Sequence, residues 1–324
     1  MAAVLLLNMG GPESLEEVGP FLRELFDDPM ILPLPGGRMT RRLLGRSIAT
    51  LRCRKTQAAY RRIGGGSPLR RLTALQAELL GGELSRRGRD GVRVEPVLRY
   101  TQPRAETVLA QLAAAGELRA LALPLYPQEC VATTGSSLAE LEAMRRRVAG
   151  HLSVDVIRSY HLDPGYLTAV AERIEEALAA LPPGERERAI LLFSAHGVPV
   201  RLLQSGDPYV EQIGETVEGV MDRVGRDRSY RLSFQSRTGP IRWVGPTTEE
   251  MIRELAGTPA VVVVPISFVS DHIETLYEID CLYAEEARRH RIGRFVRTEA
   301  LHDSHRFCAA LADLVEAWLD RRHG

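Results

Sequence analysis

The sequence predicts an α/β fold in two domains, built on parallel sheets that helices cover on both faces. Two observations indicate this fold. Strand patterns alternate with helical patterns along the whole chain, and the length of 324 residues exceeds what one hydrophobic core usually serves. The segments VLLLNMGG and ILLFSAHG also look like the opening strands of two equivalent halves, and we place the domain boundary near residue 150.

The first half is predicted to alternate four strands with helices. Its first strand spans Val4 to Leu7. Ser14 and Glu17 have the spacing of a capping box, so we expect a helix to begin there. The apolar face of that helix would contain Leu15, Val18, Leu22 and Leu25. The other predicted elements are strands at 92–100, 118–125 and 154–157, a helix from Pro103 to about Gly116, and a helix from Ser136 through Val148.

The second half repeats the same scheme. Asp163 and Pro164 are typical of a helix start, and the segment LPPGERER at 181–188 is predicted to be an exposed loop. The predicted strands are at 189–194, 230–235, 261–268 and 294–296, with helices between them.

Two of these strands end at residues that can do chemistry. His196 follows the first of them, and Asp271, His272 and Glu274 follow the third. Ligands bind at the carboxyl ends of strands in open α/β sheets, so we expect these side chains to converge. Two imidazoles and two carboxylates can move protons and bind a divalent metal. Taken alone, His196 could equally be a packed core histidine.

Two other histidines and a glycine-rich segment are weaker candidates for a functional site. His302 and His305 have the spacing of one helix face, and a solvated helix entrance is the simpler interpretation. The segment IGGGSPL at 63–69 would either form a flexible turn or bind an anionic group through its backbone N–H groups.

A long segment without acidic residues follows the first predicted helix. From Pro29 to Ala77 there is no Asp or Glu, whereas the segment contains ten arginines and Lys55. It can be a solvated basic face, a surface that recognises carboxylates, or one that is attracted to anionic lipid. We do not expect nucleic-acid binding, because Tyr60 is the only aromatic residue in the segment.

Composition excludes several classes of protein. The 42 basic residues balance 42 acidic ones, so net charge indicates no partner. Lys55 is the only lysine and lies in an arginine-rich stretch, so Schiff-base chemistry and the lysine of a phosphate-binding loop have no plausible candidate. The apolar start is too short for a signal peptide or a membrane anchor. The cysteines are far apart and have no CxxC spacing, which argues against disulfides and zinc ribbons and favours a cytoplasmic protein.

Taken together, several segments resemble the ferrochelatases, the enzymes that insert ferrous iron into a porphyrin to make haem. The matches occur in order between residues 5 and 280. They are LLLNMGGPES, FLRELF, YRRIGGGSPL, LRY, LYPQ with TTGSS, LLFSAHGVP with GDPY, QSRTGP with WVGP, and PISFVSDHIETLYEID.

The resemblance implies two Rossmann-like domains with parallel four-stranded sheets, as in other chelatases, and an active-site cleft between them. The first domain would comprise residues 1–150 with the C-terminal helix 303–324, and the second would comprise residues 151–302. His196 and Glu274 would be the essential pair that faces the porphyrin and contacts the metal, and Asp271 and His272 would complete a proton-transfer network. The porphyrin site would contain Met9, Arg62, Arg99, Tyr100 and Trp243, with an apolar lip that includes Phe21, Leu22, Leu25 and Ile31.

The implied reaction is insertion of Fe²⁺ into protoporphyrin IX with release of two protons. Fe²⁺ would be a substrate, and we expect no permanently bound cofactor and no [2Fe–2S] cluster, because the C-terminal region lacks clustered cysteines. We also expect peripheral contact with an anionic membrane, at the inner face of the cell membrane. The sequence departs from the family in one respect, because Leu282 follows Glu274 and Glu278 where a third acid is often found.

Three alternatives remain open at this point. The substrate could be coproporphyrin III, or the enzyme could be a chelatase for another tetrapyrrole. In family members that use coproporphyrin III a tyrosine commonly occupies the position of Met9, so the methionine favours protoporphyrin. A carrier of haem or porphyrin would need an axial iron ligand but no proton acceptor, so the pairing of His196 with Glu274 favours an enzyme.

Overall fold

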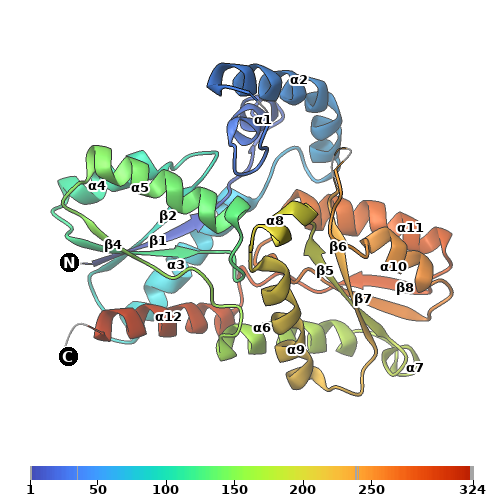
Figure 1. Ribbon diagram of the computed structural model, residues 1–324. Coiled ribbons are helices and arrows are strands. Elements are labelled where there is room, and N and C mark those ends of the chain that lie inside the picture. The colour runs from blue at the N-terminus through green and yellow to red at the C-terminus, as the bar shows by residue number, and fades with distance from the viewer. Residues whose placement is uncertain (1, 35, 238, 240, 322–324) are drawn as a thin grey trace. The chain divides into compact units, whose positions relative to one another are not determined.

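The computed structural model describes residues 2–34, 36–237, 239 and 241–321. The chain divides into two compact units. The first comprises Met1–Ser159 with Leu311–Gly324, and the second comprises Tyr160–Ala310. Each unit contains one parallel four-stranded sheet with helices on both faces (Figure 1), which confirms the predicted α/β fold.

In the first unit the strand order is β2-β1-β3-β4, and all neighbours are parallel. Residues 3–7 of the central strand β1 are almost completely buried, because both faces of the sheet are covered. All four strands lie where the sequence predicts them, with ends that differ by at most two residues. Their bounds are β1 Ala2–Asn8, β2 Val92–Leu98, β3 Arg119–Pro124 and β4 Ser153–Val156.

Helices cover both faces of this sheet (Figure 1). The helices α4 (Ala105–Ala114) and α5 (Ser136–Val148) pack on one face, and α5 follows a short π-helix, η1 (Val131–Gly135). The helix α3 (Leu69–Arg86) and the end of α12 (His305–Asp320) lie on the other face. Trp318 of α12 donates a 2.8 Å hydrogen bond to Asp155 of β4, which anchors the end of that helix.

The helices α1 (Val18–Asp27) and α2 (Arg38–Arg62) form a separate pair of the first unit (Figure 1). They approach closely at Gly45, where a Cβ atom would lie 2.7 Å from the backbone oxygen of Phe26. The predicted capping box was wrong. The Glu17 carboxylate accepts from the backbone N–H of Glu13 at 2.8 Å and not from that of Ser14, so residues 13–17 form turns and α1 begins at Val18.

The second unit has the strand order β6-β5-β7-β8, so β5 occupies the same place in its sheet as β1 does in the first. The predicted third strand was too long. It ends at Val264 because Pro265 has no N–H group to continue the ladder. The first predicted strand of this unit instead extends two residues past its predicted end, to His196. The bounds are β5 Ile190–His196, β6 Tyr230–Gln235, β7 Ala260–Val264 and β8 Arg294–Arg297.

The helices of the second unit also cover both faces of its sheet (Figure 1). The helix α6 begins as predicted, since the Asp163 carboxylate accepts from the backbone N–H of Tyr166 at 2.8 Å. The predicted loop at 181–188 contains one short helix, α7. The bounds are α6 Pro164–Ala179, α7 Pro183–Arg186, α8 Val200–Gln204, α9 Tyr209–Val224, α10 Thr248–Glu254, the π-helix η2 Glu274–Tyr283 and α11 Ala284–Arg289.

Candidate active site

His196 is the last residue of β5. Its backbone N–H and its carbonyl both form hydrogen bonds to side chains. Its N–H donates to the hydroxyl of Ser267 at 2.9 Å, and its carbonyl accepts from the hydroxyl of Tyr209 at 3.1 Å. The next residue must be small, because a Cβ atom at Gly197 would lie 2.6 Å from the backbone oxygen of Gln235. The imidazole therefore projects from a rigid strand end.

Glu274 begins the π-helix η2 and meets His196 directly. Nδ1 of His196 lies 2.8 Å from Oε2 of Glu274. An ionised carboxylate only accepts hydrogen bonds, so Nδ1 carries the proton of this bond. In the neutral imidazole Nε2 is then the nitrogen with a lone pair, and it is the one that can accept a proton.

The charges of this pair stabilise one another. Desolvation alone would lower the pKa of His196, but the Glu274 carboxylate outweighs it and the pKa of His196 lies above its usual value. Desolvation would raise the pKa of Glu274, whereas the attraction of His196 lowers that pKa to about 2. Each charge thus favours the other, so the pair favours an imidazolium beside a carboxylate.

His272 lies beside this pair but is not hydrogen-bonded to it. Its Nδ1 is 3.2 Å from the carbonyl of Ser270, and its Nε2 is 3.9 Å from Oε1 of Glu274. Burial lowers the pKa of His272, so this ring is neutral at pH 7. The ring of Phe268 packs against it, with centroids 4.4 Å apart. The charge of Glu274 acts on the pKa of His272 through space and not through a hydrogen bond.

Asp271 forms its hydrogen bonds with residues outside the pair of His196 and Glu274. Nη1 of Arg297, at the end of β8, donates to its carboxylate at 2.9 Å, and the hydroxyl of Thr275 donates at 3.0 Å. Arg297 also donates two 2.9 Å bonds to Asp280, and its side chain is only 9% exposed. Across the described ranges we find no hydrogen bond from Asp271 to His272 or Glu274. The geometry makes Asp271 an anchor of η2 to β8.

Two residues that the sequence analysis gave no role complete the polar cluster. The hydroxyl of Ser236, directly after β6, lies 2.9 Å from Oε2 of Glu274 and 2.5 Å from Oε2 of Glu278. A hydroxyl carries one proton, so two such bonds need a second proton from a carboxyl group. Burial, followed by repulsion from Glu274, raises the pKa of Glu278 to about 7, which makes Glu278 the group that carries this proton.

Trp243 lies beside the end of β5. It forms an isolated bridge with Pro199, and its ring is 3.6 Å from the position that a Cβ atom of Gly197 would take. Within the part of the chain that the structure describes, its Nε1 is buried and has no hydrogen-bond partner. The indole therefore packs on the segment that follows His196.

The first unit contains the other residues that were assigned to the porphyrin. Arg99 and Tyr100 both donate to Oδ2 of Asp28, each at 2.8 Å, and Arg99 also reaches Glu140 at 3.3 Å. Burial would raise the pKa of Asp28, but its hydrogen bonds, led by that of Ser136, hold this pKa below its usual value. Asp28 was not identified from the sequence, although it is the last acid before the basic segment.

The residues predicted for the apolar lip differ in their exposure. Phe21 and Leu22 are 9% and 5% exposed, and the ring of Phe21 packs edge-on against that of Tyr100 with centroids 6.2 Å apart. The half-buried positions are Met9, directly after β1, Leu25 on α1, and Ile31. Arg62 is exposed at the end of α2.

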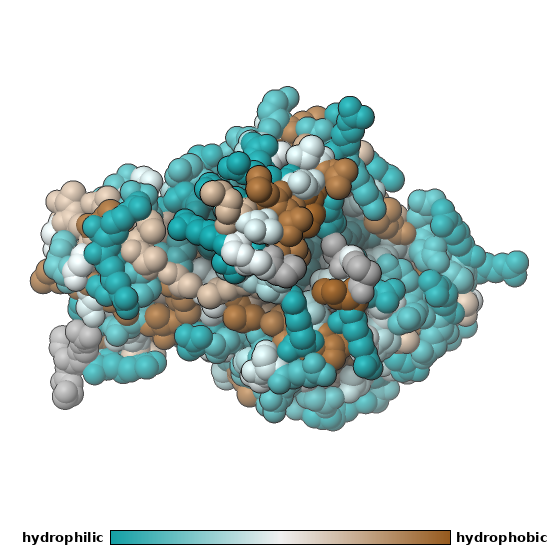
Figure 2. All heavy atoms as spheres, turned by 45° about the horizontal axis from the view of Figure 1, so that its top comes forward, coloured by the Kyte–Doolittle hydropathy of each residue, from teal (hydrophilic) through white to brown (hydrophobic). Residues whose placement is uncertain are grey.

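The two most exposed of the large apolar residues described lie on α2. Met39 is 77% exposed and Leu51 is 82% exposed, and Leu43 lies between them at helical spacing. Figure 2 shows apolar side chains among hydrophilic ones on this face. We refer to Met39, Leu43 and Leu51 as the α2 apolar stripe.

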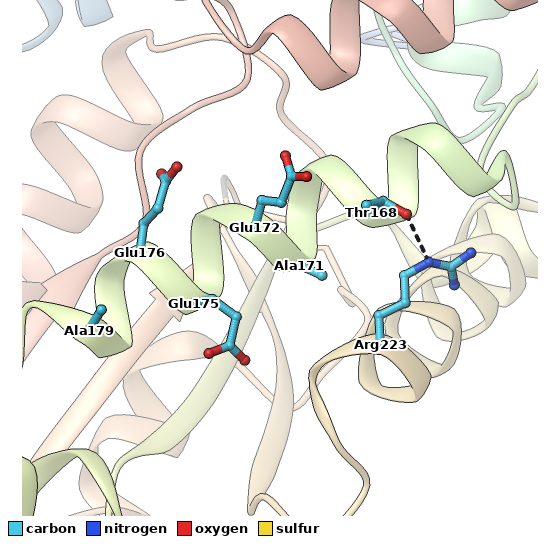
Figure 3. Close-up of a pocket in the computed structure, with 7 residues that line it drawn as sticks. All are labelled: Thr168, Ala171, Glu172, Glu175, Glu176, Ala179 and Arg223. Atoms are coloured by element: carbon cyan, nitrogen blue, oxygen red, sulfur yellow. Dashed lines mark hydrogen bonds between the residues drawn. The ribbon is translucent and has the colours of Figure 1, made fainter.

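A shallow pocket of about 520 Å³ is found on another part of the second unit. Figure 3 shows that its residues come mainly from α6, with Arg223 of α9 donating to the hydroxyl of Thr168 at 3.2 Å. Glu172 and Glu176 in its wall are already paired with arginines. None of the predicted site residues lines it. Among the described residues we find no cluster of three or more metal-binding side chains.

Comparison with known proteins agrees with the motifs. Residues 1–319 match the family model described as Ferrochelatase. The ferrochelatase of Synechococcus elongatus is 46% identical over 323 residues, which cover 98% of this chain and 82% of that protein. The ferrochelatase of Geotalea daltonii is 42% identical over 317 residues, which cover 97% of each.

The fold has counterparts among solved structures. SirB from Bacillus subtilis with Fe³⁺ has a TM-score of 0.56 at 14% identity, and the match covers 97% of this chain and 94% of that chain. CbiX, described as the terminal enzyme of sirohaem biosynthesis in denitrifying bacteria, has a TM-score of 0.52 at 13% identity and covers 98% of each. At these identities the likeness concerns the fold alone.

Proposed function

Because the chain belongs to the ferrochelatase family, we propose that it inserts Fe²⁺ into protoporphyrin IX to form protohaem, with release of two protons, as the terminal step of haem synthesis. The observation that carries the proposal is the bond between His196 and Glu274 at the end of β5. Fe²⁺ is a substrate of this reaction. The proposal includes no permanently bound cofactor and no iron–sulfur cluster.

The reaction needs a proton acceptor beside the ring. Metal insertion removes two pyrrole protons and strips water from the ion. The positive charge of an arriving Fe²⁺ disfavours the imidazolium form of His196, which releases its proton and becomes a neutral acceptor through Nε2. Glu274 stabilises the imidazolium each time it forms, and Glu278, with a pKa of about 7, passes protons onward at neutral pH.

The same groups can hold the incoming ion briefly. An imidazole nitrogen and carboxylate oxygens are ordinary ligands of first-row divalent metals. His196 and Glu274 keep the metal-contacting role that the resemblance gives them. The ion must pass from the protein to the porphyrin, so protein side chains cannot occupy all of its coordination positions.

The first prediction concerns the porphyrin. We expect kcat/KM for protoporphyrin IX to exceed that for coproporphyrin III by at least about tenfold, or about 1.4 kcal/mol in transition-state stabilisation. Met9 offers an apolar thioether to the ring, and unpaired burial of two further propionates would be costly. Arg62 and its neighbours would pair the two propionates that protoporphyrin has. Parallel steady-state assays with anaerobic Fe²⁺ and each porphyrin measure the ratio.

The assay also separates an enzyme from a carrier. Loss of porphyrin fluorescence over many equivalents per protein supports catalysis, whereas loss that stops at one equivalent contradicts it and supports a haem or porphyrin carrier. A higher kcat/KM for coproporphyrin III would contradict the protoporphyrin assignment and leave iron insertion standing.

We also propose reversible contact between the α2 apolar stripe and an anionic membrane from the cytoplasmic side. The structure contains no described helix that is both long and apolar enough to cross a membrane. The stripe is flanked by exposed basic residues from the acid-free segment. Each basic residue near a surface contributes roughly 1 kcal/mol toward anionic lipid, and the stripe adds apolar contact.

The second prediction tests this contact. We expect the protein to sediment with anionic vesicles at low salt and to be released as the salt concentration rises. Leu51→Ser should weaken this binding. Leu118→Ser is the matched control, because Leu118 is an exposed leucine of the first unit outside α2. Equal binding to neutral and anionic vesicles would rule out the electrostatic part of this proposal.

A further inference from the structure

Ser236 has an unusual backbone conformation for a serine. Its φ angle is +68°, in the left-handed region that a Cβ atom disfavours. Among the described residues, Arg291 is the only other residue besides glycine with a positive φ, at +58°. Strained backbone of this kind persists where surrounding structure holds it, and it clusters at functional sites.

Buried polar groups hold the strand end that precedes Ser236. Gln235 is fully buried, and its side-chain oxygen accepts from the hydroxyl of Ser194 at 2.7 Å. That hydroxyl lies 3.0 Å from the hydroxyl of Thr248, which is also fully buried. The backbone N–H of Gly197 donates to the carbonyl of Gln235 at 2.8 Å. Gln235, the residue before Ser236, is therefore fixed to β5, and through Ser194 to α10.

The hydroxyl of Ser236 shares an acceptor with His196. Oε2 of Glu274 lies 2.9 Å from the Ser236 hydroxyl and 2.8 Å from Nδ1 of His196, so one carboxylate oxygen accepts from two sides. Two bonds to one oxygen fix the rotation of the carboxylate about its last side-chain bond. The same hydroxyl lies 2.5 Å from Glu278, one π-helical turn along η2.

We propose that Ser236 is a positioning residue for iron insertion, whose hydroxyl orients the Glu274 carboxylate toward His196 and joins it to Glu278. The inference rests on the proposed function. The left-handed backbone conformation directs the hydroxyl to both carboxylates, and loss of the hydroxyl frees the Glu274 carboxylate to rotate away from Nδ1 of His196.

A glycine variant distinguishes the effect of losing the hydroxyl from the effect of backbone strain. Ser236→Gly removes the hydroxyl and suits the positive φ, so the melting temperature should be no lower than that of the wild type. We expect kcat for iron insertion to fall more than about fivefold, with KM for the porphyrin changed less than about twofold, because the porphyrin-binding residues are intact. Ser236→Ala removes the hydroxyl and keeps the Cβ atom, so it should lose activity to a similar extent.

Arg291→Gly is the matched control, because it relieves the other left-handed residue without touching this cluster. We expect wild-type kcat from it. A kcat of Ser236→Gly above about one fifth of the wild-type value overturns the inference, and so does a loss confined to Ser236→Ala. If Ser236→Gly fails to fold, Ser236→Ala alone decides by the same threshold. Absence of turnover by the wild type would instead refute the proposed function, so the two failures are distinguishable.

Discussion

His196→Ala is expected to lower kcat for iron insertion by a factor on the order of 10³, while the porphyrin still binds. The variant loses the nitrogen that accepts the pyrrole protons, and it leaves Glu274 without the partner that holds the pKa of that carboxyl near 2. Porphyrin binding should persist because the residues assigned to the ring are unchanged. The rate of haem formation at saturating substrate concentrations gives kcat, and a fluorescence titration with porphyrin measures binding.

The second unit provides a matched control for this variant. Nε2 of His161 lies 2.7 Å from Glu215, so it forms another histidine–carboxylate pair in the same unit. His161→Ala should retain wild-type kcat. Multiple turnovers by His196→Ala at a wild-type rate would contradict the assignment of His196 as the proton acceptor.

Glu274→Gln is expected to lower kcat about 100-fold, since it removes charge and keeps the shape of the side chain. The imidazolium of His196 then lacks its counter-charge. Glu215→Gln is the corresponding control and should behave as the wild type does. An unchanged kcat in Glu274→Gln would transfer its role to Asp271 or Glu278.

The same variant should change the pH dependence in a defined direction. Glu274 raises the pKa of His196, and only the neutral imidazole accepts a proton, so wild-type turnover should fall as the pH drops below this raised value. Removing the charge lowers the pKa of His196. The residual activity of Glu274→Gln should therefore persist to lower pH than that of the wild type. A shift of the acidic limb toward higher pH would contradict this account.

Periodicity predicted the sheets well because buried parallel strands have a strong local pattern. The β1 and β5 segments are nearly continuous apolar runs, and parallel strands covered on both faces require such runs. Element ends were harder to predict. Pro265 ended β7 early through a missing N–H group, and Glu17 bonded to the backbone of Glu13 in a turn that its spacing to Ser14 did not reveal.

Only those site residues could be predicted whose type commonly takes part in catalysis or metal binding. Histidine and glutamate after a strand indicated His196 and Glu274, and the structure places them 2.8 Å apart. Ser236 lies in the segment QSRTGP that carries the resemblance, but serine is a common residue and the sequence analysis assigned it no role; its backbone angle and two oxygen distances indicate one. Asp271 had the expected residue type, but its ion pair with Arg297 depends on the distant strand β8.

Lys55 lies exposed on α2, and it is the only lysine in the chain. Apart from the terminal amine, it is therefore the single site at which an acylating reagent can attach a fluorophore. Arginine supplies all the other basic side chains and does not react with such reagents under mild conditions. An environment-sensitive dye attached there would report on the surroundings of α2 in the native sequence, without introducing a cysteine or any other substitution.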